Sequence, residues 1–144
     1  MNVRRIVLDE DYPLLKTWWE RRGAEAPQRA LLPPIGVLVE KFCVPMACAF
    51  LYEVKDAPIA MVEWEATNPD CRSAMATVRA LNMVFDFLET YCADNGIAVV
   101  LSWVEEGRGD GRILSGRKWR KCPGERHALM AFQTQPQEAP CLPS

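Results

Sequence analysis

The sequence contains a single histidine, His127, and no Cys-x-x-Cys pair, so the common zinc and redox motifs are missing. Its six cysteines are scattered, and the closest two are Cys43 and Cys48. Cys48 lies in an apolar run and Cys92 on an apolar helical face, where a free thiol behaves as a small hydrophobic group. A catalytic triad would have to use the lone histidine. These shortages favour reduced structural thiols and predict no metal site.

Long apolar runs and a strong charge imbalance are also absent. No stretch approaches the roughly 18 apolar residues that a transmembrane helix needs. The first residues run from a basic pair into acids, which is not typical of a signal peptide. The net charge is -2, so no global attraction to nucleic acid or an anionic membrane is expected. The 144 residues therefore predict one cytoplasmic domain with a substantial core.

Hydrophobic periodicity predicts the order β-α-βββ-α-β-α-ββ. The predicted strands are residues 3–8, 36–42, 46–54, 58–66, 97–103, 119–121 and 126–133, and the predicted helices are 9–23, 71–95 and a short one near 110–115. Such an order indicates an α/β (α+β) fold, with helices on both faces of a mixed sheet of six to seven strands. We expect residues 1–133 to form a single domain and residues 134–144 a loosely ordered tail.

Capping residues and an apolar face define the two long predicted helices. Asp9 has the character of an N-cap, with further acids in the first turn, and Gly23 ends that helix. The second helix ends at Asn95-Gly96. Its predicted apolar face comprises Val78, Leu81, Val84, Phe85, Leu88, Tyr91 and Cys92.

Several short motifs resemble those of the GNAT acetyltransferase superfamily, particularly of small phage- or prophage-encoded members. The matching pieces are Trp18-Trp19 with Arg22-Gly23, Leu32-Pro33-Pro34 with Gly36, Ala49-Phe50-Leu51-Tyr52, and Glu63-Trp64 with Asn68-Pro69. The resemblance covers roughly residues 1–133. It implies the GNAT fold, acetyl-CoA as cofactor, and acetyl transfer to an amine of a small molecule or protein. It also implies a phage protein in the host cytoplasm.

In this family a glycine-rich loop and the following helix N-terminus hold the CoA pyrophosphate, because free backbone amides meet an anion there. The family pattern is Arg or Gln, two residues, Gly, one residue, then Gly or Ala. The corresponding positions here are Arg72, Ser73, Ala74, Met75, Ala76 and Thr77. Met75 and Thr77 replace small residues, which predicts a degenerate loop. The family's pantetheine arm lies between strands 58–66 and 97–103, so Ala66 and Thr67 join the expected cofactor site.

Two glutamates are the candidate catalytic bases. Glu63 and Glu65 should share one side of strand 58–66, with Ile59 and Met61, while Trp64 and Val62 point to the other side. A carboxylate between apolar and polar surroundings could have a raised pKa and accept a proton. Glu63 is the first candidate and Glu65 the second; the alternative is that both are solvated.

The family's usual leaving-group acid has no clear counterpart. It is commonly a tyrosine on the helix after strand 97–103, and that helix has no tyrosine here. Ser102 or Tyr52 could substitute.

Residues 108–126 are rich in positive charge. They include Arg108, Arg112, Arg117, Lys118, Arg120, Lys121 and Arg126. This stretch could contact CoA phosphates, a nucleic acid or an acidic protein, or form an ordinary solvated face. Trp119 could stack on a base or belong to the core. A catalytically inactive GNAT-fold binding protein, of accessory or inhibitor type, therefore stays open beside an acetyltransferase. The tryptophans and the apolar meander could also support a homodimer.

Overall fold

The computed structural model describes residues 1–105, 113–122 and 127–133. The predicted tail, Arg108, Arg112 and Arg126 lie outside these ranges. The described elements confirm the predicted order: β1 (Asn2–Arg5), α1 (Leu8–Arg21), the 3-10 turn η1 (Arg29–Leu31), β2 (Ile35–Lys41), β3 (Val44–Glu53), β4 (Ile59–Thr67), α2 (Ala74–Asp94), β5 (Val99–Glu105), β6 (Arg120–Cys122) and β7 (His127–Gln133). A helical turn at 113–115 precedes β6.

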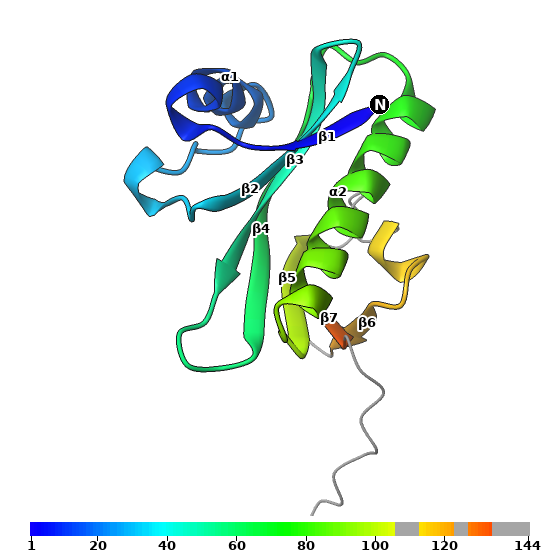
Figure 1. Cartoon of the computed structure of the whole chain (residues 1–144). Coiled ribbons are helices and arrows are strands. Elements are labelled where there is room, and N and C mark those ends of the chain that lie inside the picture. The colour runs from blue at the N-terminus through cyan, green and yellow to red at the C-terminus, as the bar shows by residue number, and fades with distance from the viewer. Residues whose placement is uncertain (106–112, 123–126, 134–144) are drawn as a thin grey trace, which may run out of the picture.

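The strands form one seven-stranded mixed sheet in the order β1-β2-β3-β4-β5-β7-β6. Every neighbouring pair is antiparallel except β4 and β5, which run parallel. A parallel pair needs a crossover, and α2 supplies it. Figure 1 shows α1 and α2 on opposite sides of the sheet. The α/β prediction with helices on both faces is therefore confirmed.

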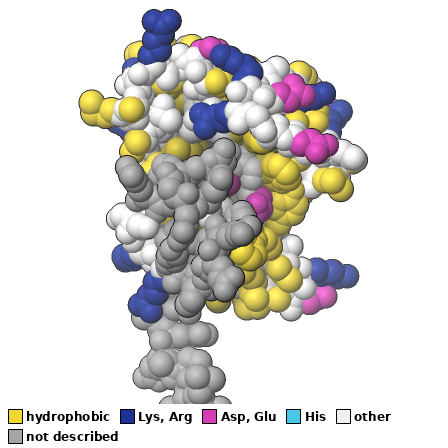
Figure 2. All heavy atoms as spheres, turned by 180° about the vertical axis from the view of Figure 1, so that it is seen from behind, with side chains coloured by type: hydrophobic (Ala, Val, Ile, Leu, Met, Phe, Trp, Pro, Cys, Tyr) yellow, Lys and Arg dark blue, Asp and Glu magenta, His cyan; other side chains and the backbone are white. Residues whose placement is uncertain are grey.

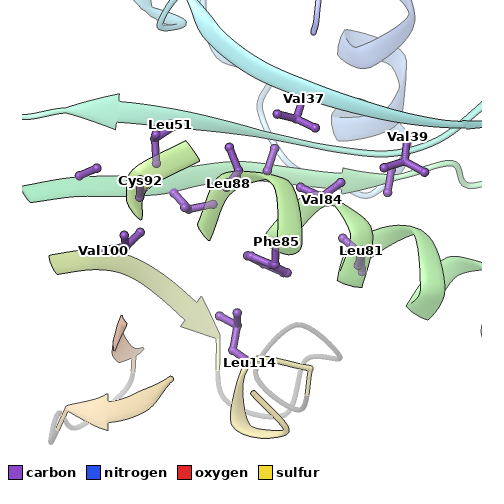
Figure 3. Close-up of a cluster of buried hydrophobic side chains, with 14 of the residues drawn as sticks. Val37, Val39, Leu51, Leu81, Val84, Phe85, Leu88, Cys92, Val100 and Leu114 are labelled. Carbon is purple, nitrogen blue, oxygen red and sulfur yellow. The ribbon is translucent and has the colours of Figure 1, made fainter. Parts of the chain in front are cut away.

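Each helix covers its own core. The α2-side core, drawn in Figure 3, packs Val84, Phe85 and Leu88 of α2 against strand residues that include Val37 and Leu51. The α1-side core gathers Leu15, Trp18 and Trp19 of α1 with strand residues that include Leu38 and Phe50. Because side chains alternate along a strand, membership of one core or the other shows which way each strand residue points.

Helix α2 follows its sequence pattern closely. Ser73 is the N-cap and accepts a hydrogen bond from the Ala76 amide at 3.2 Å, and Gly96 follows the helix end with φ +71°. Leu81, Val84, Phe85, Leu88 and Cys92 are buried as predicted. Val78 was placed wrongly on this face: its side chain is 45% exposed, whereas Ala76, two residues earlier, packs against the α2-side core.

Helix α1 begins earlier than its acidic residues suggest. Val7, not Asp9, occupies the N-cap position and makes no side-chain cap. Instead the Asp11 carboxylate accepts the Val7 amide at 2.8 Å and a paired hydrogen bond from Arg4. Arg4 lowers the pKa of Asp11. Asp9 lies in the first turn and pairs with Arg29. The prediction of Asp9 as the N-cap is wrong, because the buried carboxylate of Asp11, inside the helix, accepts the amide at the N-cap position.

Four cysteines are free thiols, as the spacing predicts: Cys43, Cys48, Cys71 and Cys92. Burial raises the pKa of Cys48, and it raises that of Cys92 to about 12, so neither is a ready nucleophile. Within the described ranges, no His, Cys, Asp and Glu side chains cluster in a way that could hold a metal ion. In those same ranges, no helix combines the length and apolar character needed to cross a membrane.

Candidate functional site

The parallel strands β4 and β5 pair only at their beginnings. Their register runs from Ile59 opposite Val99 to Val62 opposite Ser102. Beyond that point β4 continues beside β3 alone and β5 beside β7 alone. The two strands therefore diverge, and we call the space between residues 63–67 and 103–105 the β4–β5 opening. The facing backbone edges have no strand partner there, which suits an extended ligand, although the Trp103 amide and the Thr67 carbonyl bond to side chains of this chain.

A bulge in β4 changes which way its residues point. The register with β3 shifts between Cys48 opposite Ala66 and Phe50 opposite Glu63. Trp64 has φ +59°, which is rare for a residue with a side chain. Val62 packs in the α2-side core, whereas Trp64 and Ala66 belong to the α1-side core. The prediction that Trp64 shares a side with Val62 is therefore wrong, because the extra residue breaks the alternation.

The bulge also separates the two candidate bases. Glu63 alternates with Val62 and so faces the α1 side, while Glu65 alternates with Ala66 and faces the α2 side. The predicted common face for the two glutamates is wrong for this reason. Neither is a solvated residue beyond the sheet, since both are partly buried.

Glu63 stands at the start of the β4–β5 opening. The backbone amide of Trp103, on β5, hydrogen bonds to its carboxylate. Its Oε1 atom is buried and has no hydrogen-bond partner among the described residues. Burial raises the pKa of Glu63, and the Trp103 amide offsets only part of that rise. A carboxylate with a raised pKa is a better proton acceptor near neutral pH.

Glu65 bridges the opening on the other side of the sheet. Its Oε1 atom accepts a hydrogen bond from Ser102 Oγ at 2.9 Å, and Ser102 is fully buried. Tyr52 donates its hydroxyl proton to the Leu31 carbonyl at 2.9 Å and accepts from Trp64 Nε1 at 3.1 Å. Both hydroxyls proposed as substitutes for the family's tyrosine are thus held by other partners.

The expected cofactor loop leads directly into α2. Arg72 and Met75 are exposed, the latter at 82%. The Ala76 amide bonds to Ser73, and the Thr77 hydroxyl donates to the Ser73 carbonyl at 3.1 Å. In the described part of the chain, no acceptor is recorded for the amides of Ala74 and Met75. Free amides at the positive end of a 21-residue helix suit an anion.

Two consecutive arginines hold this connection in place, and sequence reasoning assigned them no role. Arg22 donates to both the carbonyl and the hydroxyl of Thr67, the last residue of β4. Arg21 forms a paired contact with Asp70 at 2.8 and 2.9 Å. Their position just before Gly23, at a helix end, was the available signal, because arginines there often bond to nearby carbonyl groups.

The basic stretch is divided by the fold. Arg117 is largely buried and bonds to Glu89 at 2.8 Å, to Asp86 at 2.5 Å and to Asn82 at 3.0 Å. Trp119 is a core residue whose Nε1 donates to Glu89 at 2.7 Å. Lys118 and Arg120 remain exposed. Arg117 is therefore committed to α2 and is not a free charge for a partner.

No family model matches the sequence, and no curated protein matches it by sequence comparison. Solved structures do resemble it. The chain is similar to the ribosomal-protein-S18-alanine N-acetyltransferase of Escherichia coli, with a TM-score of 0.73 and 12% identity over 99% of both chains. It is also similar to a Salmonella typhimurium protein solved with its cofactor acetyl-CoA, with a TM-score of 0.67 and 12% identity over 96% of both chains.

A third resemblance is to N-acetylglutamate synthase from Neisseria gonorrhoeae, complexed with coenzyme A and N-acetyl-glutamate. The TM-score is 0.69 at 14% identity, over 93% of this chain and 35% of that one. These likenesses establish that the chain has the GNAT acetyltransferase fold.

Proposed function

We propose that this protein is an N-acetyltransferase that binds acetyl-CoA in the β4–β5 opening and transfers its acetyl group to an amine. The observation that carries the proposal is the divergence of β4 and β5 beyond Val62 and Ser102, beside the N-terminus of α2. Solved structures of this fold include proteins complexed with CoA or acetyl-CoA.

The residues present fit such a cofactor. The edge of β4 near Ala66 and Thr67 has no strand partner on the β5 side, so backbone groups there can bond to the amides of a pantetheine arm. The Thr67 carbonyl, which already accepts from Arg22, has one remaining lone pair for such a bond. The segment from Arg72 to Thr77 presents amides and a helix end to a pyrophosphate. The exposed side chain of Met75 extends into solvent and can move away from an approaching phosphate. When bound, acetyl-CoA would supply the acetyl group as a thioester.

Glu63 is the residue best placed to accept a proton from the amine. It lies at the start of the opening, and its raised pKa brings it closer to the operating pH than an exposed glutamate. Glu65 is the weaker candidate, because its carboxylate is bonded to Ser102. We assign Glu65 to holding β4 and β5 together on the α2 side.

Titration with CoA and acetyl-CoA tests the proposal. Either ligand at 100 times its Kd should stabilise the fold by about 2.7 kcal/mol, measured by calorimetry or thermal shift. Adenosine bisphosphate and pantetheine, added separately, would show whether the helix end and the opening each contribute. An unchanged melting temperature at millimolar CoA would contradict cofactor binding and therefore the proposed N-acetyltransferase activity.

A second candidate function is a GNAT-fold protein that binds a partner without catalysis. It is favoured by the engagement of Ser102 and Tyr52, which leaves neither hydroxyl free as a leaving-group acid. Its partner would be an acidic protein or a nucleic acid, contacted through the exposed Lys118 and Arg120. Changing Lys118 and Arg120 to glutamate should abolish binding of the acidic protein or nucleic acid. Unchanged binding would show that this surface is not the contact site.

A further inference from the structure

One part of the sheet on the α1 side is aromatic and partly open. Apart from Trp64, which the bulge turns to this side, its residues alternate along their strands with residues of the α2-side core such as Leu51, Val62 and Val100. We call this surface the aromatic face; its residues are Tyr52, Met61, Glu63, Trp64, Leu101 and Trp103. Figure 2, which views the molecule from behind, shows hydrophobic side chains gathered beside acidic ones on that side.

The strand register places these residues next to one another. Tyr52 lies opposite Met61, and Met61 lies opposite Leu101, so the three form one row across β3, β4 and β5. Glu63 and Trp103 follow one position beyond the last paired residues, at the start of the β4–β5 opening. Glu63 and Trp103 thus lie side by side next to the apolar row, and the indole of Trp103 is 51% exposed.

The aromatic groups on the β4 side are held rigidly. Trp64 packs edge-on against Trp19 at 6.1 Å between ring centroids and donates to the Tyr52 hydroxyl. That hydroxyl in turn donates to the Leu31 carbonyl. Rigid aromatic groups make good binding surfaces, because little conformational entropy is lost when a ligand packs on them.

Glu63 is the one charged residue of the aromatic face. No ion pair of its carboxylate is recorded among the described residues, and its Oε1 atom is buried without a hydrogen-bond donor. An ammonium group would satisfy that oxygen, and aromatic rings attract cations through their electron-rich faces. A ligand carboxylate at the same place would instead meet a like charge in partly desolvated surroundings.

We propose that the aromatic face is the acceptor site and that it selects a small primary amine carried on an aromatic body, with no carboxylate beside the amine. This inference rests on the proposed acetyl transfer for its chemistry, but not for binding of the amine. In the reaction, the amine nitrogen would form a bond to the acetyl carbon as the bond from that carbon to the CoA sulfur breaks. One ammonium proton goes to Glu63 and then to water, and the second goes to the departing sulfur.

The first experiment compares phenethylamine with phenylalanine, which differs from it by an added carboxylate. Calorimetry on the full chain without acetyl-CoA should show phenethylamine binding at least about tenfold more tightly, a difference of about 1.4 kcal/mol. Trp103→Ala and Glu63→Gln should each weaken phenethylamine binding severalfold. Val44→Ala, which removes a similarly exposed apolar group at the start of β3, should leave it unchanged.

Kinetics with acetyl-CoA provide a second readout. Trp103→Ala should raise KM for phenethylamine while leaving kcat nearly unchanged, since the indole binds the body of the amine and not the reacting atoms. If Trp103 had a merely structural role, Trp103→Ala would instead lower kcat as well, or would lower the melting temperature.

The outcomes separate this inference from the proposed function. Selective amine binding that depends on Trp103 would support the aromatic face even if CoA failed to bind, which would overturn only the acetyltransferase. If CoA bound but phenylalanine or glutamate bound as well as phenethylamine, the acceptor assignment would be overturned while acetyl transfer remained. Binding of phenethylamine that is unaffected by Trp103→Ala would also overturn it.

Discussion

Arg22, the residue after α1, donates hydrogen bonds to both the carbonyl oxygen and the hydroxyl of Thr67, the last residue of β4. Thr67 is buried, so these groups have little access to water. The end of the first helix therefore holds the start of the β4–α2 connection, which carries the expected cofactor loop. Asn68 adds a bond to the Pro45 carbonyl at 2.9 Å from the other side. The connection is positioned by these bonds, although it lacks the glycines of the GNAT pattern that it resembles.

Arg22→Ala should lower the free energy of unfolding by about 1–3 kcal/mol, because it leaves the buried oxygens of Thr67 without a charged donor. It should also weaken the binding of CoA more than the binding of pantetheine, since the connection leads to the proposed pyrophosphate site. Chemical denaturation and calorimetry measure the two effects. The matched control is Arg21→Ala, which removes an exposed pair with Asp70 and should cost less stability. Equal losses in the two variants would contradict this account of Arg22.

Gly36→Ala should destabilise the fold by about 1–3 kcal/mol through overpacking. A Cβ atom at this position would lie 2.7 Å from Phe50 Cε1 and 2.9 Å from Ile6 Cδ1. Combining Gly36→Ala with Phe50→Leu should cost less than the sum of the single changes, because the smaller side chain relieves the contact. Urea denaturation of the four proteins gives this coupling, and strict additivity would show that Phe50 is not the obstacle.

Glu63→Gln should change how stability depends on pH. The folded protein raises the pKa of this carboxyl above its ordinary value of 4.5, so it binds the proton more tightly than the unfolded chain does. The stability contributed by protonated Glu63 is present below about that pH and is lost as pH rises through the folded pKa. The glutamine variant should therefore gain stability relative to the original chain from about pH 4.5 upward. A stability difference that stays constant or reverses over this window, in denaturation at several pH values, would be inconsistent with the raised pKa.

Arg117→Met should destabilise the protein by about 2 kcal/mol, because it removes the common partner of Asp86 and Glu89 on α2. Lys118→Glu with Arg120→Glu changes two exposed charges and should have little effect on stability. Thermal denaturation compares the variants. If Arg117→Met proved neutral, the guanidinium would not be the structural group that its contacts indicate.

Met75→Gly should tighten CoA binding by restoring a small residue where the family has glycine. The helix should tolerate the change at modest cost, since Met75 lies in the first turn and is exposed. Calorimetric titration of CoA checks the prediction, with Val78→Ala, also exposed on α2, as the control. Weaker binding by the glycine variant would show that the methionine contributes to the site.

Much of the fold could be predicted because local patterns coincide with the tertiary arrangement. The helical spacing of Leu81, Val84 and Leu88 identified α2, and Asn95-Gly96 marked its end. The short links in the β2–β3–β4 meander required antiparallel pairing, which the register confirms. These features depend on neighbours a few positions apart, where backbone geometry and burial impose a fixed period.

The candidate site depended on contacts that no local pattern contains. Strict alternation placed Glu63 and Glu65 on one side of β4, but the bulge at Trp64 sent them to opposite sides. Arg117 was expected in a basic stretch that is either a contact surface or a solvated face, but it reaches across to acids on α2. By itself the sequence determined which segments are helix and strand and how they follow one another. Only the tertiary structure decided which carboxylate faces the opening and which arginine is buried, because both depend on how segments far apart in the chain pack together and exclude water.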